Sequence, residues 1–162
     1  MRAFCFALVA ACLATAVGAQ SAQVAFGGMQ QDRNAPVEVT AGSLSVNQTD
    51  GTARYDGYVL IRQGAMRLQA ETVTVVFDDA GGRIERCEAT GGITLVSGQD
   101  AAEAARADYN IDAGTITLIG DVLLTQGANA IAAERMVVDL ADGTADMSGR
   151  VRTLLQPAGQ DQ

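Results

Sequence analysis

The fold is decided by residues 114–127, which read GTITLIGDVLLTQG with Gly120 at the centre. Three other segments align with this stretch on a central glycine: residues 51–64 (GTARYDGYVLIRQG), 86–98 (RCEATGGITLVSG) and 143–153 (GTADMSGRVRT). The central glycines Gly57, Gly91, Gly120 and Gly149 are 34, 29 and 29 residues apart, and turn glycines follow seven residues later at Gly64, Gly98 and Gly127. Self-similarity with such a period indicates a repeat architecture.

Apolar residues alternate on both sides of each central glycine. Side chains two positions apart point to the same face of a strand, so positions two and four away from the glycine form one set. Fifteen of the sixteen residues in this set are apolar or aromatic, whereas only four of the sixteen at positions one and three away are large and apolar. The contrast predicts half-buried strands with one dry face, because a helical period of about 3.6 residues would mix the two sets.

Further alternating segments lie between these strands, and we predict them to be return strands: residues 72–77, 107–111 and 136–140. Asp-rich and Gly-rich turns separate the strands. Residues 100–107 have helical character, with Ala101, Ala102, Ala104 and Ala105, so we interpret them as a longer connection. The prediction is an all-β domain over residues 36–157, a solenoid-like roll in which each repeat adds a layer, followed by a disordered tail at residues 158–162.

The N-terminus is typical of a secretory signal peptide. Arg2 is followed by an apolar run, residues 3–17, that is too short for a stable membrane span. We therefore predict a signal peptide at residues 1–19, a flexible N-terminal segment at residues 20–35, and a mature protein in the periplasm. A lipoprotein signal processed at Cys12 is the alternative.

The mature chain lacks much of the chemistry that enzymes use. It contains no His, which excludes Ser-His-Asp triads, Cys-His pairs and His-based zinc sites. Acidic pairs such as Asp139 and Asp142 fall at predicted turns, where carboxylates ordinarily act as turn formers. Cys87 is the single cysteine after the signal peptide and is interpreted as a buried apolar group. We predict no catalytic residue, no metal site and no cofactor.

The charge of the mature chain argues against nucleic acids as partners. After residue 19 the chain has 19 acidic residues and ten basic ones, all Arg, for a side-chain charge of -9. Binding to phosphate backbones requires clustered cations. We therefore predict no nucleic-acid partner.

The repeated phrases resemble a known family. Residues 36–41 (PVEVTA), 51–64, 114–127 and 133–149 strongly resemble the LptA/OstA family of periplasmic lipopolysaccharide-transport proteins, over about Pro36 to Pro157. The resemblance implies a twisted, open antiparallel β-jellyroll whose apolar interior holds the acyl chains of lipid A. It also implies that copies stack head to tail, edge strand on edge strand, between an inner-membrane LptC-like protein and an outer-membrane LptD-like translocon.

The resemblance matches Val37, Val39, Leu95, Tyr109 and Ile111 to interior residues that contact lipid. We predict a lipid-binding interior groove lined by Val37, Val39, Val59, Ile61, Leu95, Tyr109, Ile111, Leu118, Val122, Leu124 and Val138. Partner-binding edge strands are predicted at Val37, Glu38, Val39 and Thr40 and at Val151, Arg152, Thr153, Leu154 and Leu155, since exposed edges recruit other strands. Candidate residues for local positive charge, which the phosphates of lipid A call for, are Arg54, Arg62, Arg67, Arg150 and Arg152.

Alternation alone does not distinguish a closed core from an open groove. A second interpretation therefore remains: a noncatalytic envelope adaptor of the same fold, similar to LptC, that joins membrane complexes by its edge strands. Arg substituted for Leu95 or Ile111 discriminates between the two, because a core would unfold whereas a groove would lose lipid. An enzyme acting on envelope glycans is a third, poorly supported interpretation.

Overall fold

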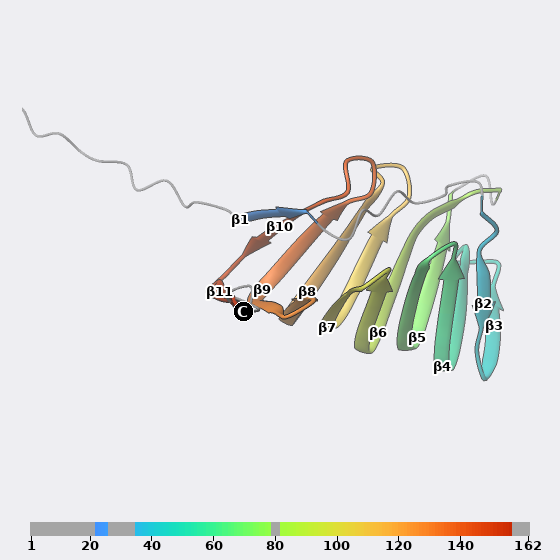
Figure 1. The fold of residues 1–162 in the computed structure, drawn as a ribbon. Coiled ribbons are helices and arrows are strands. Elements are labelled where there is room, and N and C mark those ends of the chain that lie inside the picture. Colours follow the sequence, from blue (N-terminus) through green and yellow to red (C-terminus); the bar gives the residue numbers. More distant parts are fainter. Residues whose placement is uncertain (1–21, 26–34, 79–81, 157–162) are drawn as a thin grey trace, which may run out of the picture.

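The computed structural model describes residues 22–25, 35–78 and 82–156, and these form a curved β-sheet (Figure 1). The strands are β1 (Ala22–Ala25), β2 (Glu38–Thr40), β3 (Ser43–Asn47), β4 (Thr52–Gln63), β5 (Met66–Phe77), β6 (Ile84–Ser97), β7 (Asp100–Asn110), β8 (Thr115–Gln126), β9 (Asn129–Asp139), β10 (Thr144–Ser148) and β11 (Arg152–Leu154). The sheet order is β1-β10-β9-β8-β7-β6-β5-β4-β2, with β3 paired to β4 and β11 paired to β9. The predicted signal peptide and the tail at residues 158–162 lie outside the described residues.

The long strands bend at the repeat glycines. In β4, β6 and β8 two consecutive residues oppose a single residue of the next strand, at 57–58, 91–92 and 120–121. Both residues of each pair have positive φ, between 48° and 88°. Such bulges bend a strand and increase its twist. The central glycines of the repeat therefore form the corner of the roll.

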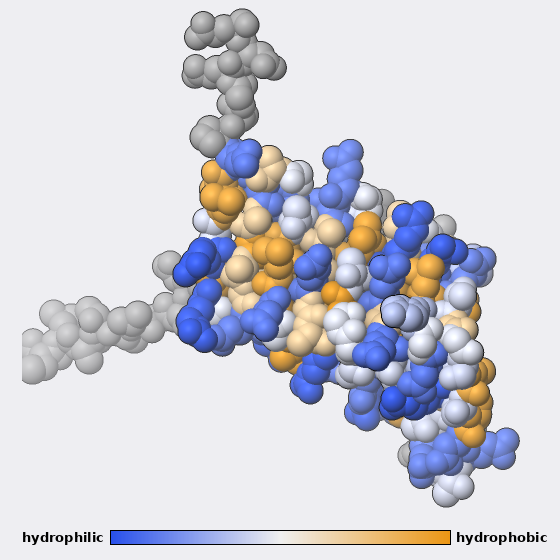
Figure 2. Space-filling view, turned by 90° about the horizontal axis from the view of Figure 1, so that it is seen from below, coloured by the Kyte–Doolittle hydropathy of each residue, from blue (hydrophilic) through white to orange (hydrophobic). Residues whose placement is uncertain are grey.

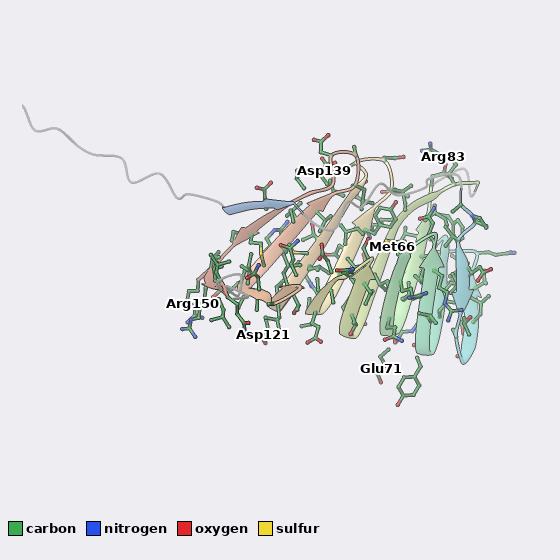
Figure 3. All side chains as sticks on the ribbon, viewed as in Figure 1. Met66, Glu71, Arg83, Asp121, Asp139 and Arg150 are labelled. Atoms are coloured by element: carbon green, nitrogen blue, oxygen red, sulfur yellow. The ribbon has the colours of Figure 1, made fainter. Side chains whose placement is uncertain are left out.

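The corner divides the sheet into two walls. The first wall runs from β3 to β1 and contains residues 43–47, 52–56, 72–77, 84–90, 106–110, 115–119, 135–139, 144–148 and 22–25. The second wall runs from β2 to β11 and contains residues 38–40, 59–63, 66–70, 93–97, 100–104, 122–126, 129–133 and 152–154. Figure 3 shows Glu71, Asp121 and Arg150 along the corner, and Arg83 and Asp139 at the opposite ends of the first wall's strands.

The core lies between the two walls. The structure has a single sheet and no helix in its described part, so one face of the sheet is buried only by folding one wall over the other. The largest fully buried side chains come from both walls: Val59, Val73, Ile93, Leu95, Ile116, Leu118, Val122, Leu124, Met136, Val138 and Met147. Most of them belong to the set of residues predicted to form the dry face of the strands. The prediction of one dry face is therefore confirmed. On the side of the molecule that Figure 2 shows, hydrophilic residues surround apolar patches.

Residues 100–107 belong to a strand, so their interpretation as a connection was wrong. They begin β7, which lies in the middle of the sheet between β6 and β8. Ala102 and Ala104 are buried on the inner face, whereas Ala105 is exposed. Ala102 is the Cα partner of Leu95 and of Leu124, and its small side chain leaves room for these two leucines. Pairing on both edges overrides the weak helix propensity of alanine.

Gly91 and Gly92 offer a matched pair that tests the corner. Both have positive φ, at 88° and 78°, so Ala at either position costs about 1 to 2 kcal/mol in backbone strain. A Cβ at Gly91 would overlap the side chain of Glu71, whereas a Cβ at Gly92 would meet no atom within 4 Å. We expect Gly91→Ala to lower the free energy of unfolding by about 1 to 3 kcal/mol more than Gly92→Ala, because of this overlap. Urea unfolding followed by circular dichroism measures the difference, and equal losses would contradict the close packing of the corner.

Candidate functional site

Six of the predicted groove residues are packed inside the core. Leu95, Leu118, Leu124 and Val138 are 0% exposed, and Val59 and Val122 are 1% exposed. These side chains come from both walls and face one another across the interior, where they belong to one hydrophobic cluster. The interior between the walls is therefore a buried core at these six positions.

Three other predicted groove residues meet at a cavity. Val37, Tyr109 and Ile111 line a cavity of about 570 Å³, together with Gln63, Gly82, Arg83, Ile84, Asp112 and Gly114. Val37 and Gln63 lie at the second wall, and the others come from the hairpin ends of the first wall. We call this opening between the two walls the seam. Its volume lies in the range of cavities that hold small ligands, roughly 300 to 1,000 Å³.

Hydrogen bonds to backbone carbonyls hold the residues of the seam in place. The N–H of Ile111 donates to the carbonyl of Glu85 at 3.1 Å, which ties the β7–β8 hairpin to β6. The Gln63 side-chain amide donates to the carbonyl of Ala35 at 3.3 Å and fixes the segment that carries Val37. The remaining predicted groove residues, Val39 and Ile61, are Cα partners on β2 and β4 beside this segment. Ile61 is half-buried and Val39 is exposed.

Arg83 is the basic residue at the seam, and acidic residues surround it. Its guanidinium lies 3.6 Å from Asp78 and 3.3 Å from Asp112. Asp78 Oδ1 also accepts hydrogen bonds from the N–H groups of Gly82 and Arg83, at 3.0 and 3.3 Å. These N–H groups and then the Arg83 charge hold the pKa of Asp78 below its ordinary value of 3.8. Asp78 thus closes a turn beside the seam and balances the positive charge of Arg83.

The candidate basic residues differ in their pairing. Arg54 lies 3.0 Å from Asp56, and Arg150 lies 2.8 Å from Glu134. Arg62, Arg67 and Arg152 take part in none of the ion pairs between described residues. Arg62 and Arg67 are exposed Cα partners on β4 and β5, so two like charges stand directly opposite each other, which is unfavourable by itself. On its other side Arg62 is the Cα partner of Glu38 on β2, so Arg67 is the cation of this pair that has no acidic Cα partner on β4.

Both ends of the roll expose apolar residues. At the β2–β3 end Val37, Leu44 and Val46 are 58%, 53% and 63% exposed. The alternation along β3 places Leu44 and Val46 on the inner face, opposite Tyr55 and Ala53. At the β11 end the exposed apolar residues are Val151, Leu154 and Leu155. The predicted edge segments therefore contain β2 and β11, whereas β3 and β1 were missed from the sequence, although the alternation in residues 43–47 (SLSVN) was a signal for β3.

Cys87 lies on the inner face of β6, between its Cα partners Val75 and Tyr109. Burial raises the pKa of its thiol from 9.0 to about 11. Only the thiolate is reactive, so at pH 8 we expect alkylation by iodoacetamide to be about a hundredfold slower in the folded protein than in urea. Mass spectrometry of timed samples measures both rates. Equal rates would show that Cys87 is open to solvent.

The acidic pairs act in turns. Asp139 Oδ1 accepts the N–H of Ala141 at 2.8 Å and that of Asp142 at 3.2 Å. Across the described ranges, no group of three His, Cys, Asp or Glu side chains is placed to hold a metal ion. The described residues also form no helix that is long and apolar enough to cross a membrane.

Comparison with known proteins finds two sequence relatives. An uncharacterised protein of Rhizobium meliloti (strain 1021) is 29% identical over 161 residues, which cover 93% of this chain and 87% of that protein. The lipopolysaccharide export system protein LptH of Pseudomonas aeruginosa (strain PAO1) is 27% identical over 118 residues, which cover 68% of this chain and 67% of LptH.

A solved structure and a family model also match. The crystal structure of LptH, the LptA homologous periplasmic component of the lipopolysaccharide transport device of Pseudomonas aeruginosa, superimposes with a TM-score of 0.70 at 22% identity, covering 78% of this chain and 99% of the LptH chain. This likeness confirms the predicted open, twisted β-jellyroll. The family model described as LptA/(LptD N-terminal domain) LPS transport protein matches residues 38–144. Since these residues make up more than half of the chain, it belongs to the LptA/LptD N-terminal domain family of lipopolysaccharide transport proteins.

Proposed function

We propose that this protein binds lipopolysaccharide in the periplasm and passes it along a head-to-tail stack of copies towards the outer membrane, without catalysing a reaction. The seam carries the proposal, because it brings Val37, Tyr109 and Ile111 together from the two walls at an opening of the apolar interior. Membership of a family of lipopolysaccharide transport proteins supports it.

Acyl chains supply the affinity in this proposal. Each methylene that leaves water contributes roughly 0.8 kcal/mol, so a lipid with several chains leaves an apolar site for bulk water very slowly. Acyl chains enter through the seam and lie against Tyr109 and Ile111. Leu95 and Leu118 are fully buried between the walls, so chains reach them only when the walls move apart.

The headgroup lies outside the seam in this proposal. Arg62 and Arg67 are adjacent to Gln63 and Met66 at the β4–β5 hairpin, and Gln63 lines the seam. A phosphate bound between the two guanidinium groups would relieve their repulsion and form charge-assisted hydrogen bonds. The acidic net charge of the chain is therefore compatible with local recognition of an anion.

The two ends of the roll connect the stack. The apolar residues at the β2–β3 end become buried when a second copy continues the interior, and unpaired edge strands supply the hydrogen bonds. We propose that the first copy in the stack meets an inner-membrane LptC-like protein and the last meets an outer-membrane LptD-like translocon.

Photo-crosslinking in living cells tests the proposal. A photoreactive amino acid is placed at Tyr109 or, as the matched control, at Asp108, the next residue on β7, which points to the opposite face. We expect a lipopolysaccharide adduct at position 109 and none at position 108. If position 109 gives no adduct while β2 still crosslinks to envelope proteins, the chain is an adaptor rather than a lipid carrier, as its close-packed core would also allow.

A further inference from the structure

The strand β1 covers one edge of the sheet with residues from the other end of the chain. Ala22, Gln23, Val24 and Ala25 are the antiparallel Cα partners of Met147, Asp146, Ala145 and Thr144 on β10. Figure 1 shows β1 beside β10, at the end of the sheet opposite to β2 and β3. The edge of β10 that does not pair with β9 is thereby covered by a strand of the same molecule.

Within the described residues, the other three edges of the two walls are not covered by a further strand. β3 and β2 end the first and second walls at one end of the roll, and β11 ends the second wall at the other end. A stack of copies in the same orientation places β2 of one copy beside β11 of the next, where both edges are open. It also places β3 of one copy beside β10 of the next, where β1 already lies.

The direction of β1 is the direction that an incoming β3 would have. The first wall contains a continuous series of antiparallel pairs from β3 through β4 to β10, and their number makes β3 antiparallel to β10. A second copy in the same orientation therefore presents its β3 antiparallel to β10, as β1 is. β1 thus imitates the strand of a neighbouring copy.

We propose that β1 is a removable cap, which competes with β3 of a second copy of this chain for the edge of β10. The inference rests on the head-to-tail stacking proposed above. Such a cap would keep copies with exposed apolar residues at their ends apart until it is removed.

The exchange of strands has a physical driving force. β1 offers four residues to β10, whereas β3 has five. Leu44 and Val46 on β3 are exposed in one copy and would continue the inner rows of Ala145 and Met147, which are buried. The incoming strand therefore gains apolar burial. Only uncapped molecules can associate through this edge. The apparent association constant is therefore the intrinsic constant multiplied by the fraction of molecules that are uncapped.

Sedimentation velocity of residues 20–162, the chain without its predicted signal peptide, tests the cap. In one variant, residues 22–25 are replaced by Gly-Ser-Gly-Ser, which keeps the length but weakens strand pairing. We expect its self-association constant to rise by about tenfold or more, because the capped state, in which β1 occupies the edge of β10, no longer competes with association. Adding Val46→Arg should return association to the starting level, whereas Ser45→Arg, on the outward face of the same strand, should not.

A disulfide between the paired positions gives a reversible test. In a Cys87→Ala background, Gln23→Cys and Asp146→Cys place thiols at directly opposite residues of β1 and β10. We expect the oxidised protein to remain monomeric and the reduced protein to associate. Failure of the disulfide to form, or unchanged or weaker association of the Gly-Ser variant, would overturn the cap.

Lipopolysaccharide binding is measured on the same proteins. Retained binding together with no change in association rejects the cap but leaves lipid binding in place. Absence of binding by the natural chain, as well as by every variant, rejects the proposed function itself. The two failures are therefore distinguishable.

Discussion

Leu95→Ala is expected to lower the free energy of unfolding by about 2 to 5 kcal/mol. Leu95 is 0% exposed, and its Cα partners are Leu68 and Ala102 on the neighbouring strands. The small side chain of Ala102 cannot fill the space that is left. The backbone of β6 cannot move into that space either, because β6 is hydrogen-bonded to a strand on each edge. The loss therefore includes both the transfer of the leucine side chain and the cavity. Chemical unfolding followed by far-ultraviolet circular dichroism measures it.

Leu123→Ala is the matched control. Leu123 lies in the second wall on β8 but is 38% exposed, on the outward face. The same deletion there is expected to change the free energy of unfolding by about 0.5 kcal/mol or less. If Leu95→Ala were as mild as Leu123→Ala, the interior would be an open groove at Leu95, and its close packing between the walls would be incorrect.

Ile111→Arg is expected to weaken lipopolysaccharide binding by about 30-fold with little loss of stability. The guanidinium would occupy the seam beside Val37 and Tyr109 and exclude two or three methylenes of an acyl chain. At roughly 0.8 kcal/mol for each methylene this amounts to about 2 kcal/mol. Ile111 is half-buried in a hairpin, and its backbone N–H keeps its bond to Glu85, so the fold tolerates the charge. Displacement of a fluorescent lipid A analogue measures the affinity.

Val137→Arg provides the comparison on the outside of the roll. Val137 is half-buried on β9, and its Cα partner on β10 is Asp146, which favours an added cation. We expect this variant to bind lipopolysaccharide as the natural chain does. Equal losses of affinity in the two variants would indicate that charge, and not occupation of the seam, controls binding.

The strands and their buried faces could be predicted where apolar and polar residues alternate locally. Alternation around Gly120, with Ile116, Leu118, Val122 and Leu124 on one face, identified β8 and its dry side, because the side-chain period of a strand depends only on the backbone. The same pattern failed at residues 100–107, where small alanines favour a helix locally. Pairing with β6 and β8 makes these residues a strand. The local residue pattern does not reveal such pairing with other segments of the chain.

The sequence could not separate the residues of the seam from those of the core. Val37, Tyr109 and Ile111 were assigned to the interior through the family resemblance, and the structure brings them together at one cavity. Leu95 and Leu118 were assigned to the same groove, yet they lie in the packed core. One apolar face is required for both a core and a groove, so alternation could not separate these residues.

The sequence by itself determined the all-β class, the dry face and the turns, since these follow from side-chain periodicity and from the residues that accept positive φ. Only the tertiary structure decided that the repeat glycines are corners, that two walls close over a packed core with a seam beside it, and that β1 covers β10. The physical reason is that bending, closure and edge pairing depend on contacts between segments far apart in the chain, whose geometry is settled only when the whole sheet has formed.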